Sequence, residues 1–136
     1  MQYLAAFSPQ LPGIKTGRFL SLKGSLMENI HRLVKIFRKM SPYMTANQME
    51  FVLTVALYPG EGTVSYANRL KIEKAAASHL ISRLGSRGRT YSKGVRVEGL
   101  GLLTQEHSLV DARATHIYLS PEGEKLVRNL LIALAD

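Results

Sequence analysis

The chain has 136 residues, which is enough for one domain of ordinary size and too few for two independent hydrophobic cores. Its apolar fraction of 46% and charged fraction of 21% are typical of a globular protein and argue against disordered, collagen-like and low-complexity classes. Lys and Arg number 18 against 10 Asp and Glu, and the net charge of +8 indicates a polyanionic partner, either nucleic acid or an anionic membrane surface.

The chain has no cysteine, which excludes a disulfide scaffold, a cysteine-ligated zinc site and a thiol nucleophile or redox switch. No run reaches the roughly 18 apolar residues that a membrane-spanning helix needs. The sequence contains no Walker loop, no Gly-x-Gly-x-x-Gly and no nucleophile elbow, and its Ser and Asp residues lack the spacing of a catalytic triad. These features predict a cytoplasmic protein without membrane association, cofactor or enzymatic activity.

The first two segments of the chain differ in their periodicity. Prolines and glycines predict an irregular arm over residues 1–24, with a possible role in dimerisation. Apolar residues then recur at helical spacing over 26–39. Ser25 and Glu28 have the spacing of a capping box at its start, and Ser41-Pro42 is expected to end this helix.

A helix-turn-helix is predicted in the middle of the chain. Thr45 and Gln48 form a second capping-box pair, which begins a helix that ends at Tyr58. Ser65 is the expected N-cap of a short helix over 66–71. After a tight turn, a further helix over 74–84 is closed by Gly85, and two helices joined by so short a turn are the outline of a helix-turn-helix.

The remaining elements are a loop, two strands and a helix. Segment 86–99, rich in Gly, Ser, Arg and Lys, is predicted to be an exposed loop. Strands are expected over 100–106 and 115–119. A final helix begins at Ser120-Pro121-Glu122 and carries an apolar stripe. Its residues are Leu126, Leu130, Leu131 and Leu134.

A helix-turn-helix followed by a strand-loop-strand hairpin is a winged helix, so the predicted fold class is mainly α with a small β hairpin (α+β). Residues 64–78, VSYANRLKIEKAAAS, resemble the helix-turn-helix of the multiple-antibiotic-resistance regulator (MarR) family. Asp111-Ala112-Arg113 and the following IYLSPEG at 117–123 are similar to that family's wing motif. The resemblance covers residues 26–135. It implies a winged helix-turn-helix domain over 25–136 with flanking dimerisation helices, and double-stranded DNA as the partner.

Three features differ from the family pattern. Segment 86–99 intervenes where the family passes from recognition helix to wing in a few residues, and His79 stands where arginine is common. One helix follows the wing where the family generally has two, so we expect the dimer interface to combine the apolar residues of the arm with the stripe of the last helix. Regulators of this kind often bind small aromatic effectors, but no residue of this sequence identifies such a ligand.

The predicted recognition helix, 74–84, has a buried and an outward side. The aliphatic stripe at i, i+3, i+4 and i+7 must be buried. It consists of Ala77, Leu80, Ile81 and Leu84. The side chains left outside are Lys74, Ala75, Ser78, His79, Ser82 and Arg83. The small ones allow close approach to bases, and Arg83 suits a bidentate guanine or phosphate contact, with a surface ion pair as the alternative.

Basic residues cluster around this helix, with Glu73 as the single acid between residues 69 and 96. They are Arg69, Lys71, Lys74, Arg83, Arg87, Arg89, Lys93 and Arg96. We expect Arg87, Arg89, Lys93 and Arg96 of the inserted segment to contact the DNA backbone, although a solvated loop without a role is the alternative. Arg113 at the tip of the wing, 107–115, is expected in the minor groove.

Two other interpretations are less favoured by the sequence. His107 and His116 at facing positions of the wing would form a weak metal or pH-sensing pair. The basic helix over 26–39 resembles a membrane-surface helix in isolation. The predicted function is a homodimeric, nucleoid-associated transcriptional regulator, a repressor, that reads a pseudo-palindromic operator with half-sites about one helical turn apart. The alternatives are a plasmid or phage replication or partition factor and a winged-helix protein-interaction module.

Overall fold

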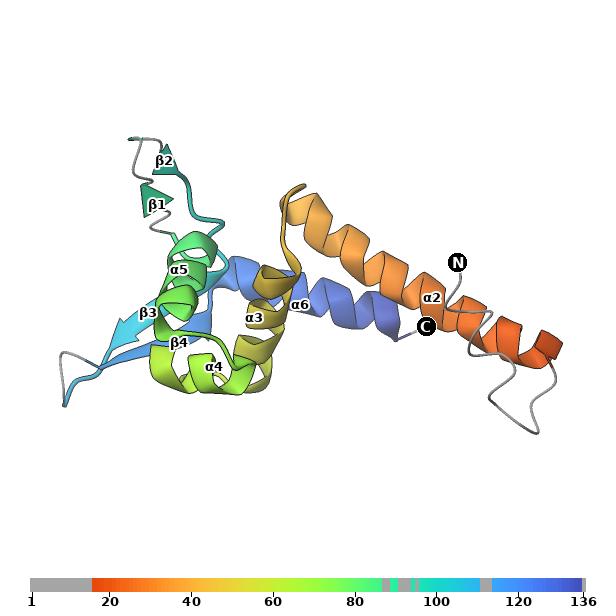
Figure 1. The fold of residues 1–136 in the computed structure, drawn as a ribbon, viewed down its shortest axis with the longest axis horizontal. Helices are drawn as coiled ribbons and strands as arrows, with labels where there is room; N and C mark the ends of the chain where they lie inside the picture. The colour runs from red at the N-terminus through yellow and green to blue at the C-terminus, as the bar shows by residue number, and fades with distance from the viewer. Residues whose placement is uncertain (1–15, 87–88, 91–93, 95, 111–113, 136) are drawn as a thin grey trace.

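The computed structural model describes residues 16–86, 89–90, 94, 96–110 and 114–135. The elements are α2 (Thr16–Met40), α3 (Ala46–Leu57), α4 (Thr63–Leu70), α5 (Lys74–Leu84), β1 (Arg89–Thr90), β2 (Arg96–Val97), β3 (Leu103–His107), β4 (Thr115–Leu119) and α6 (Pro121–Leu134). The predicted class, mainly α with a small β hairpin, is confirmed. The long helix α2 runs beside α6, and the helix-turn-helix and the hairpins lie together at the other end of the molecule (Figure 1).

The core joins the helix-turn-helix to the hairpin and to α6. Phe51 of α3 packs on Tyr66 of α4 with the ring centroids 5.5 Å apart, and both side chains are fully buried. On α5, Ala77, Ile81 and Leu84 are buried, and Leu80 is half-buried at its margin, as the stripe predicted. Burying one large aliphatic side chain contributes about 1.5–3 kcal/mol, so these contacts hold α5 in a fixed orientation.

The wing is the antiparallel pair β3–β4, in which Leu103 pairs with Leu119 and His107 with Thr115. A single bridge between Glu61 and Ile117 attaches the start of the helix-turn-helix to β4. It consists of two backbone hydrogen bonds, from the Ile117 N–H to the Glu61 carbonyl at 3.0 Å and from the Gly60 N–H to the Ile117 carbonyl at 2.8 Å. The wing is therefore connected to α4 as well as to α6.

The first helix begins earlier than predicted. Helix α2 starts at Thr16, inside the arm expected to be irregular over 1–24, and Ser25 and Glu28 lie within it instead of capping it. The helical spacing of apolar residues continues upstream through Phe19 and Leu22, so the helix passes through Gly24. A capping box in the middle of a helix has no free backbone N–H groups to satisfy. Residues 1–15 of the arm lie outside the described part of the chain.

Other boundaries are confirmed or shift slightly. Thr45 and Gln48 form the predicted capping box, with hydrogen bonds of 3.1 and 3.0 Å. Ser65 is not an N-cap, because α4 starts at Thr63 with Gly62 as the cap, and the Ser65 hydroxyl donates to the Glu61 carboxylate instead. Helix α5 and strand β4 have the predicted bounds.

The inserted segment 86–99 is not entirely a loop. Strands β1 and β2 pair antiparallel within it, Arg89 with Val97 and Thr90 with Arg96. Gly94 lies between the strands with φ of +78°, a conformation that glycine adopts without a steric penalty. The segment therefore contains a second, smaller hairpin.

The start of α6 is packed tightly against the chain that leads into β3. Ser120 is the predicted N-cap: its hydroxyl accepts from the Gly123 N–H at 3.1 Å and donates to the Gly101 carbonyl at 2.5 Å. A Cβ atom added to Gly123 would clash with the Leu102 carbonyl oxygen. Glycine is thus required at this position for close approach of two backbones.

We expect Gly123→Ala to lower the free energy of unfolding by about 1–3 kcal/mol, because helix and strand must separate to admit the methyl group. Urea denaturation followed by circular dichroism measures the change. The control is Glu124→Ala, at an exposed position one residue further along α6. Equal stability of the two variants would contradict the close approach of α6 to Leu102.

Candidate nucleic-acid interface

The turn between α4 and α5 sets the direction of the candidate recognition helix. Lys71 is left-handed with φ of 56°, and the Ile72 N–H donates to the Ala67 carbonyl at 3.0 Å, which ends α4. Glu73 is extended and becomes the N-cap residue of α5. The chain therefore reverses within three residues, and α5 presents its first turn to solvent.

The outward side of α5 carries short side chains near its N-terminus. Lys74, Ala75 and Ser78 are exposed, and so is Ala76, which the stripe pattern did not assign to this surface. The other predicted outward residues, His79, Ser82 and Arg83, are half-exposed. A helix whose exposed side is this slim can lie deep in a major groove, because the base edges are reached without long side chains in the way.

Arg83 already has a partner within the protein. Its Nη1 donates to the Glu98 carbonyl oxygen at 2.6 Å. Sequence reasoning assigned Arg83 to guanine or phosphate, or to a surface ion pair, and could not identify a backbone carbonyl as the acceptor. This contact joins the last turn of α5 to the end of the inserted segment.

Arg69 belongs to the predicted basic cluster, but its charge is paired within the protein. Its Nε and Nη2 donate to the two carboxylate oxygens of Glu61 at 2.7 and 2.6 Å, and its guanidinium lies 3.6 Å from the centroid of the Tyr58 ring. The hydrogen bonds from Arg69 and then from Ser65 lower the pKa of Glu61 from 4.5 to about 2. The pair neutralises itself and fastens α4 to the segment that bridges to β4.

The wing carries two histidines that do not face each other. His116 pairs with Glu106 and His107 with Thr115, and His116 Nδ1 lies 2.9 Å from the Gly60 carbonyl. The register therefore excludes the facing pair that the sequence left as an alternative, because it offsets the two histidines by one residue. Among the described residues no group of three or more His, Cys, Asp or Glu side chains is placed to hold a metal ion.

The other residues predicted to contact DNA lie in the inserted segment and in the wing, which the structure describes only in part. Arg87, Lys93 and Arg113 are outside them, and so is Asp111 at the wing tip. The backbones of Arg89 and Arg96 form β1 and β2. At the described part of the wing tip, Leu109 and Val110 are fully exposed.

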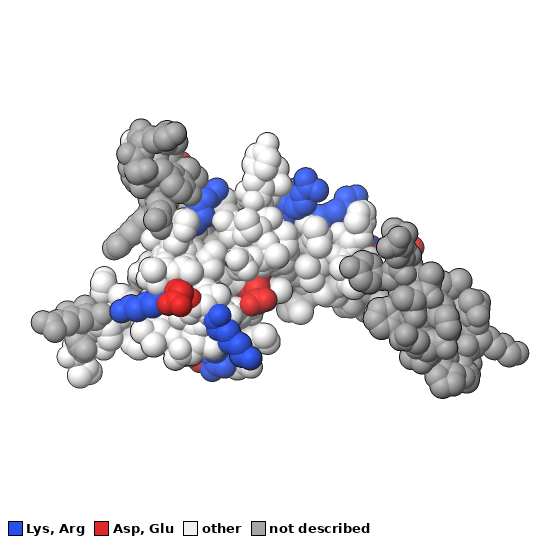
Figure 2. All heavy atoms as spheres, in the orientation of Figure 1, with Lys and Arg blue, Asp and Glu red and all other residues white. Residues whose placement is uncertain are grey.

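Basic residues of the described chain are not confined to the helix-turn-helix. Besides α5 and the inserted segment, the second half of α2 carries basic residues that are all exposed. They are Arg32, Lys35, Arg38 and Lys39. On the face in Figure 2, positive atoms lie near the end of α2 that adjoins α3, whereas positive and negative atoms are intermixed over α4 and α5. The visible charge on the helix-turn-helix is thus less one-sided than the sequence count indicated.

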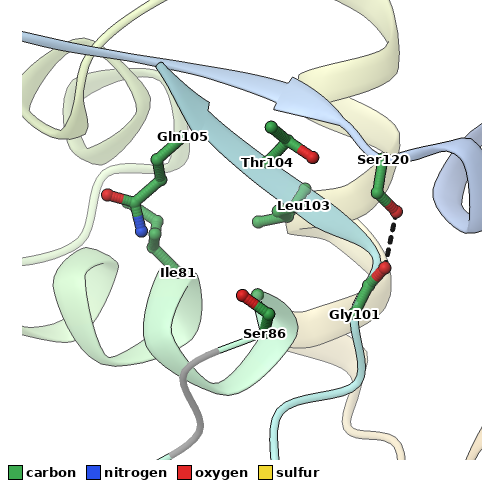
Figure 3. Close-up of a pocket in the computed structure, with 8 residues that line it drawn as sticks. Ile81, Ser86, Gly101, Leu103, Thr104, Gln105 and Ser120 are labelled. Atoms are coloured by element: carbon green, nitrogen blue, oxygen red, sulfur yellow. Dashed lines mark hydrogen bonds between the residues drawn. The ribbon is translucent and has the colours of Figure 1, made fainter. Parts of the chain in front are cut away.

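Three hollows border the elements of this interface. A shallow one of about 380 Å³ lies between the start of α4, Lys74 and β4. A second, of about 310 Å³, separates the end of α5 from β3 and is lined by Ser86, Gln105 and Ser120 among others (Figure 3). A third, of about 530 Å³, lies between α2 and α6 beside Lys125.

The Glu61–Arg69 pair predicts a specific response to acid. Because the folded state lowers the pKa of Glu61, its stabilising effect is complete above pH 4.5 and is lost as the pH falls toward 2. Both side chains are partly exposed, so solvent screens the pair and the effect is small. We expect Glu61→Gln to lose less stability than the parent chain over this window, measured by urea midpoints at several pH values.

The control for this experiment is Glu50→Gln, at an exposed glutamate on α3. It should retain the acid response of the parent chain. If Glu61→Gln and the parent chain lost stability in parallel from pH 5 to pH 2, the pair would not contribute to the acid response.

No model of a known protein family matches the chain, and no curated protein matches its sequence at a significant level. Among solved structures, the transcriptional regulator Tm0710 from Thermotoga maritima aligns with a TM-score of 0.63 at 16% identity, over 89% of this chain and 75% of that one. MepR from S. aureus, solved as a DNA complex, aligns with a TM-score of 0.60 at 16% identity, over 86% and 82%.

A MarR-like transcriptional regulator from Thermotoga maritima aligns with a TM-score of 0.58 at 19% identity, over 85% of this chain and 74% of that one. The chain therefore has the winged helix-turn-helix fold of MarR-like regulators, as the sequence motifs implied. The first of these alignments covers 89% of the chain, which is more than the segment from α4 to β4 alone. Within the described residues, none of the helices has the length and apolarity to cross a membrane.

Proposed function

We propose that the protein is a homodimeric transcriptional regulator that binds double-stranded DNA through α5. The observation that carries this proposal is the division of α5 into a buried aliphatic side and an exposed, slim side that begins at Lys74. A recognition helix contacts base edges mainly with its N-terminal residues, and these are the exposed positions of α5.

Charge supports a phosphate-binding role around this helix. Lys71 and Lys74 are exposed at the turn and at the start of α5. In the sequence, segment 86–97 adds Arg87, Arg89, Lys93 and Arg96 without an acidic residue. Cations that neutralise phosphates release counterions, so this arrangement favours nucleic acid over an uncharged protein partner.

A second copy of the chain is the partner that suits the exposed apolar surface of α2 and α6. Leu26 and Ile30 of α2 are 61% and 58% exposed, and Leu131 and Ile132 of α6 are 65% and 62% exposed. Large apolar side chains exposed on two neighbouring helices are typical of a surface that binds another protein. The sequence assigned Leu126 and Leu130 to the interface as well, but both are buried in the core of the single chain.

The DNA-binding proposal predicts that selection from random oligonucleotides enriches a pseudo-palindrome with half-sites about one helical turn apart. Affinity for the selected site should fall by roughly 10³- to 10⁵-fold between 50 and 200 mM salt if six to ten phosphates are contacted. Lys74→Ala should reduce the slope of log affinity against log salt by about 1. Arg128→Ala, at an exposed position on α6, is the matched control and should leave the slope unchanged.

Selection, salt titration and a genetic test together separate the alternatives. A protein-interaction module would enrich no sequence and would bind DNA weakly or not at all. A replication or partition factor would also bind a specific site, and deleting the gene and measuring plasmid or phage maintenance against transcript levels distinguishes it from a repressor.

The dimer predicts that Leu131→Glu dissociates the protein, because a charge placed in a buried apolar interface is strongly unfavourable. Light scattering at micromolar concentration should report a dimer for the parent chain and a monomer for the variant. Leu57→Glu places the same charge at an exposed leucine on α3 and serves as the control. A monomeric parent chain would refute the interface.

A further inference from the structure

We infer that the second half of α2 is a further DNA-binding surface, which contacts the phosphate backbone through a row of exposed cations and reads no sequence. The row, the α2 ridge, consists of Arg32, Lys35, Arg38 and Lys39. The inference goes beyond the proposed function, because the ridge belongs to a different helix from the recognition surface on α5.

The four cations of the ridge are neighbours on one side of α2. Arg32 comes three residues before Lys35, and Arg38 and Lys39 follow Lys35 by three and four residues, so that each lies one turn from the next. At a rise of about 1.5 Å per residue, the ridge from Arg32 to Lys39 is about 10 Å long. Phosphates of one DNA strand are about 3.4 Å apart along the duplex axis, so the ridge spans about three of them.

The charges of the ridge are not neutralised within the protein. All four side chains are exposed, and none of them forms an ion pair with a carboxylate that the structure describes. Arg38 Nε donates only to the Pro42 carbonyl, at 3.4 Å, and the sequence has no acidic residue from Asn29 to Met49. Like charges one turn apart destabilise a helix slightly, so folding does not account for this row, whereas a polyanionic partner does.

The neighbouring part of α6 leaves the ridge positive. Glu122 and Lys125 line the hollow of about 530 Å³ between α2 and α6, next to Lys39. One is an acid and the other a base, so their charges offset each other. The surface around the end of the ridge therefore keeps a net positive charge.

An exposed tyrosine follows the ridge in the turn between α2 and α3. The turn is fixed by hydrogen bonds from the Ser41 N–H to the Phe37 carbonyl and from the Met44 N–H to the Ser41 carbonyl, both 3.2 Å long. Phe37 and Met44 are buried, whereas Tyr43 is 90% exposed. Tyrosine hydroxyls are among the groups that bind DNA phosphates, so Tyr43 fits the same partner.

The opposite side of this half of α2 argues against a lipid surface as the partner. Leu33 and Ile36 pack against the core, and Phe37 is fully buried in it. A helix that lies on a membrane buries its apolar side in the lipid, and here that side is occupied. Lysine, which supplies two of the four cations, is depleted in protein–protein interfaces. The ridge therefore favours nucleic acid over both alternatives.

The ridge is separate from the candidate recognition helix. Helix α2 packs mainly against α6, whereas α5 packs against α3 and α4 (Figure 1). Figure 2 shows positive atoms near the end of α2 that adjoins α3. A protein that holds its site through α5 thus has a second basic surface, and this surface can meet either the flanks of the same duplex or a second duplex. Both offer the same phosphate chemistry.

Binding of a random-sequence duplex tests the ridge directly. Each phosphate contact contributes about 0.9 to the slope of log affinity against log salt, so replacing all four cations by Gln should lower the slope by about 3. Arg32→Gln alone should lower it by about 1. Arg128→Gln removes an exposed arginine from α6, changes the net charge equally and should leave the slope unchanged. Equal slopes for these two single variants would show that the ridge is merely solvated and would overturn the inference.

Two DNA arrangements show which phosphates the ridge contacts. If it contacts the flanks, affinity for a selected site should rise with flank length in the parent chain and not in the fourfold Gln variant. If it contacts a second duplex, protein on a bead-bound site should capture a labelled duplex that lacks the site, again only with the ridge intact. A parent chain that shows neither effect would refute the inference. So would binding to phosphatidylserine vesicles that requires the ridge while binding of the random duplex does not.

The inference and the proposed function fail in different ways. If selection enriches no sequence, the proposed function fails, whereas ridge-dependent binding of a random duplex still supports the inference. If a site is enriched and Lys74→Ala lowers its salt slope while the ridge substitutions do not, the proposed function stands and the inference fails. The effects of Lys74→Ala and Arg32→Gln should add, because the two residues lie on separate helices. Circular dichroism verifies that each variant is folded.

Discussion

The burial of one side of α5 is the constraint on which the rest of the structure depends. Ala77, Ile81 and Leu84 lie against the core that α3, β4 and α6 complete. With these side chains buried, the helix cannot rotate, and Lys74, Ala75 and Ser78 must face solvent. The apolar pattern of eleven residues thus determines which chemical groups the protein can offer to a partner.

The elements around α5 are held by backbone contacts more than by ion pairs. Gly123 allows α6 to approach Leu102, and Leu102 in turn donates to the end of α5. The wing, the last helix and the candidate recognition helix therefore meet at one junction. Helix α6 belongs both to this junction and to the contacts with α2.

Local signals predicted most of the fold, and the misses have physical causes. The capping residues Thr45 and Ser120 and the closing Gly85 act within a few residues of themselves, so the sequence was sufficient to place the helix ends that they define. The predicted start of α2 was wrong because the residue pattern of a capping box is the same inside a helix as at its beginning. The pair β1–β2 was missed because two-residue strands have no periodicity to detect.

Contacts between residues distant in sequence cannot be predicted from such local patterns. The register of the wing, which separates His107 from His116, depends on pairing across a hairpin. The acceptors of Arg69 and Arg83 depend on tertiary structure, and charge counting could only place both arginines in one basic cluster. For the candidate site, the exposed positions of α5 were predicted from periodicity, whereas the hydrogen bonds of the arginines follow only from the tertiary structure.

The attachment of both ends of the inserted hairpin to the end of α5 has an evolutionary consequence. A segment whose two ends are tied to one helical turn can lengthen, shorten or change composition without altering the path of the core. Variation in this segment therefore need not disturb the buried side of α5.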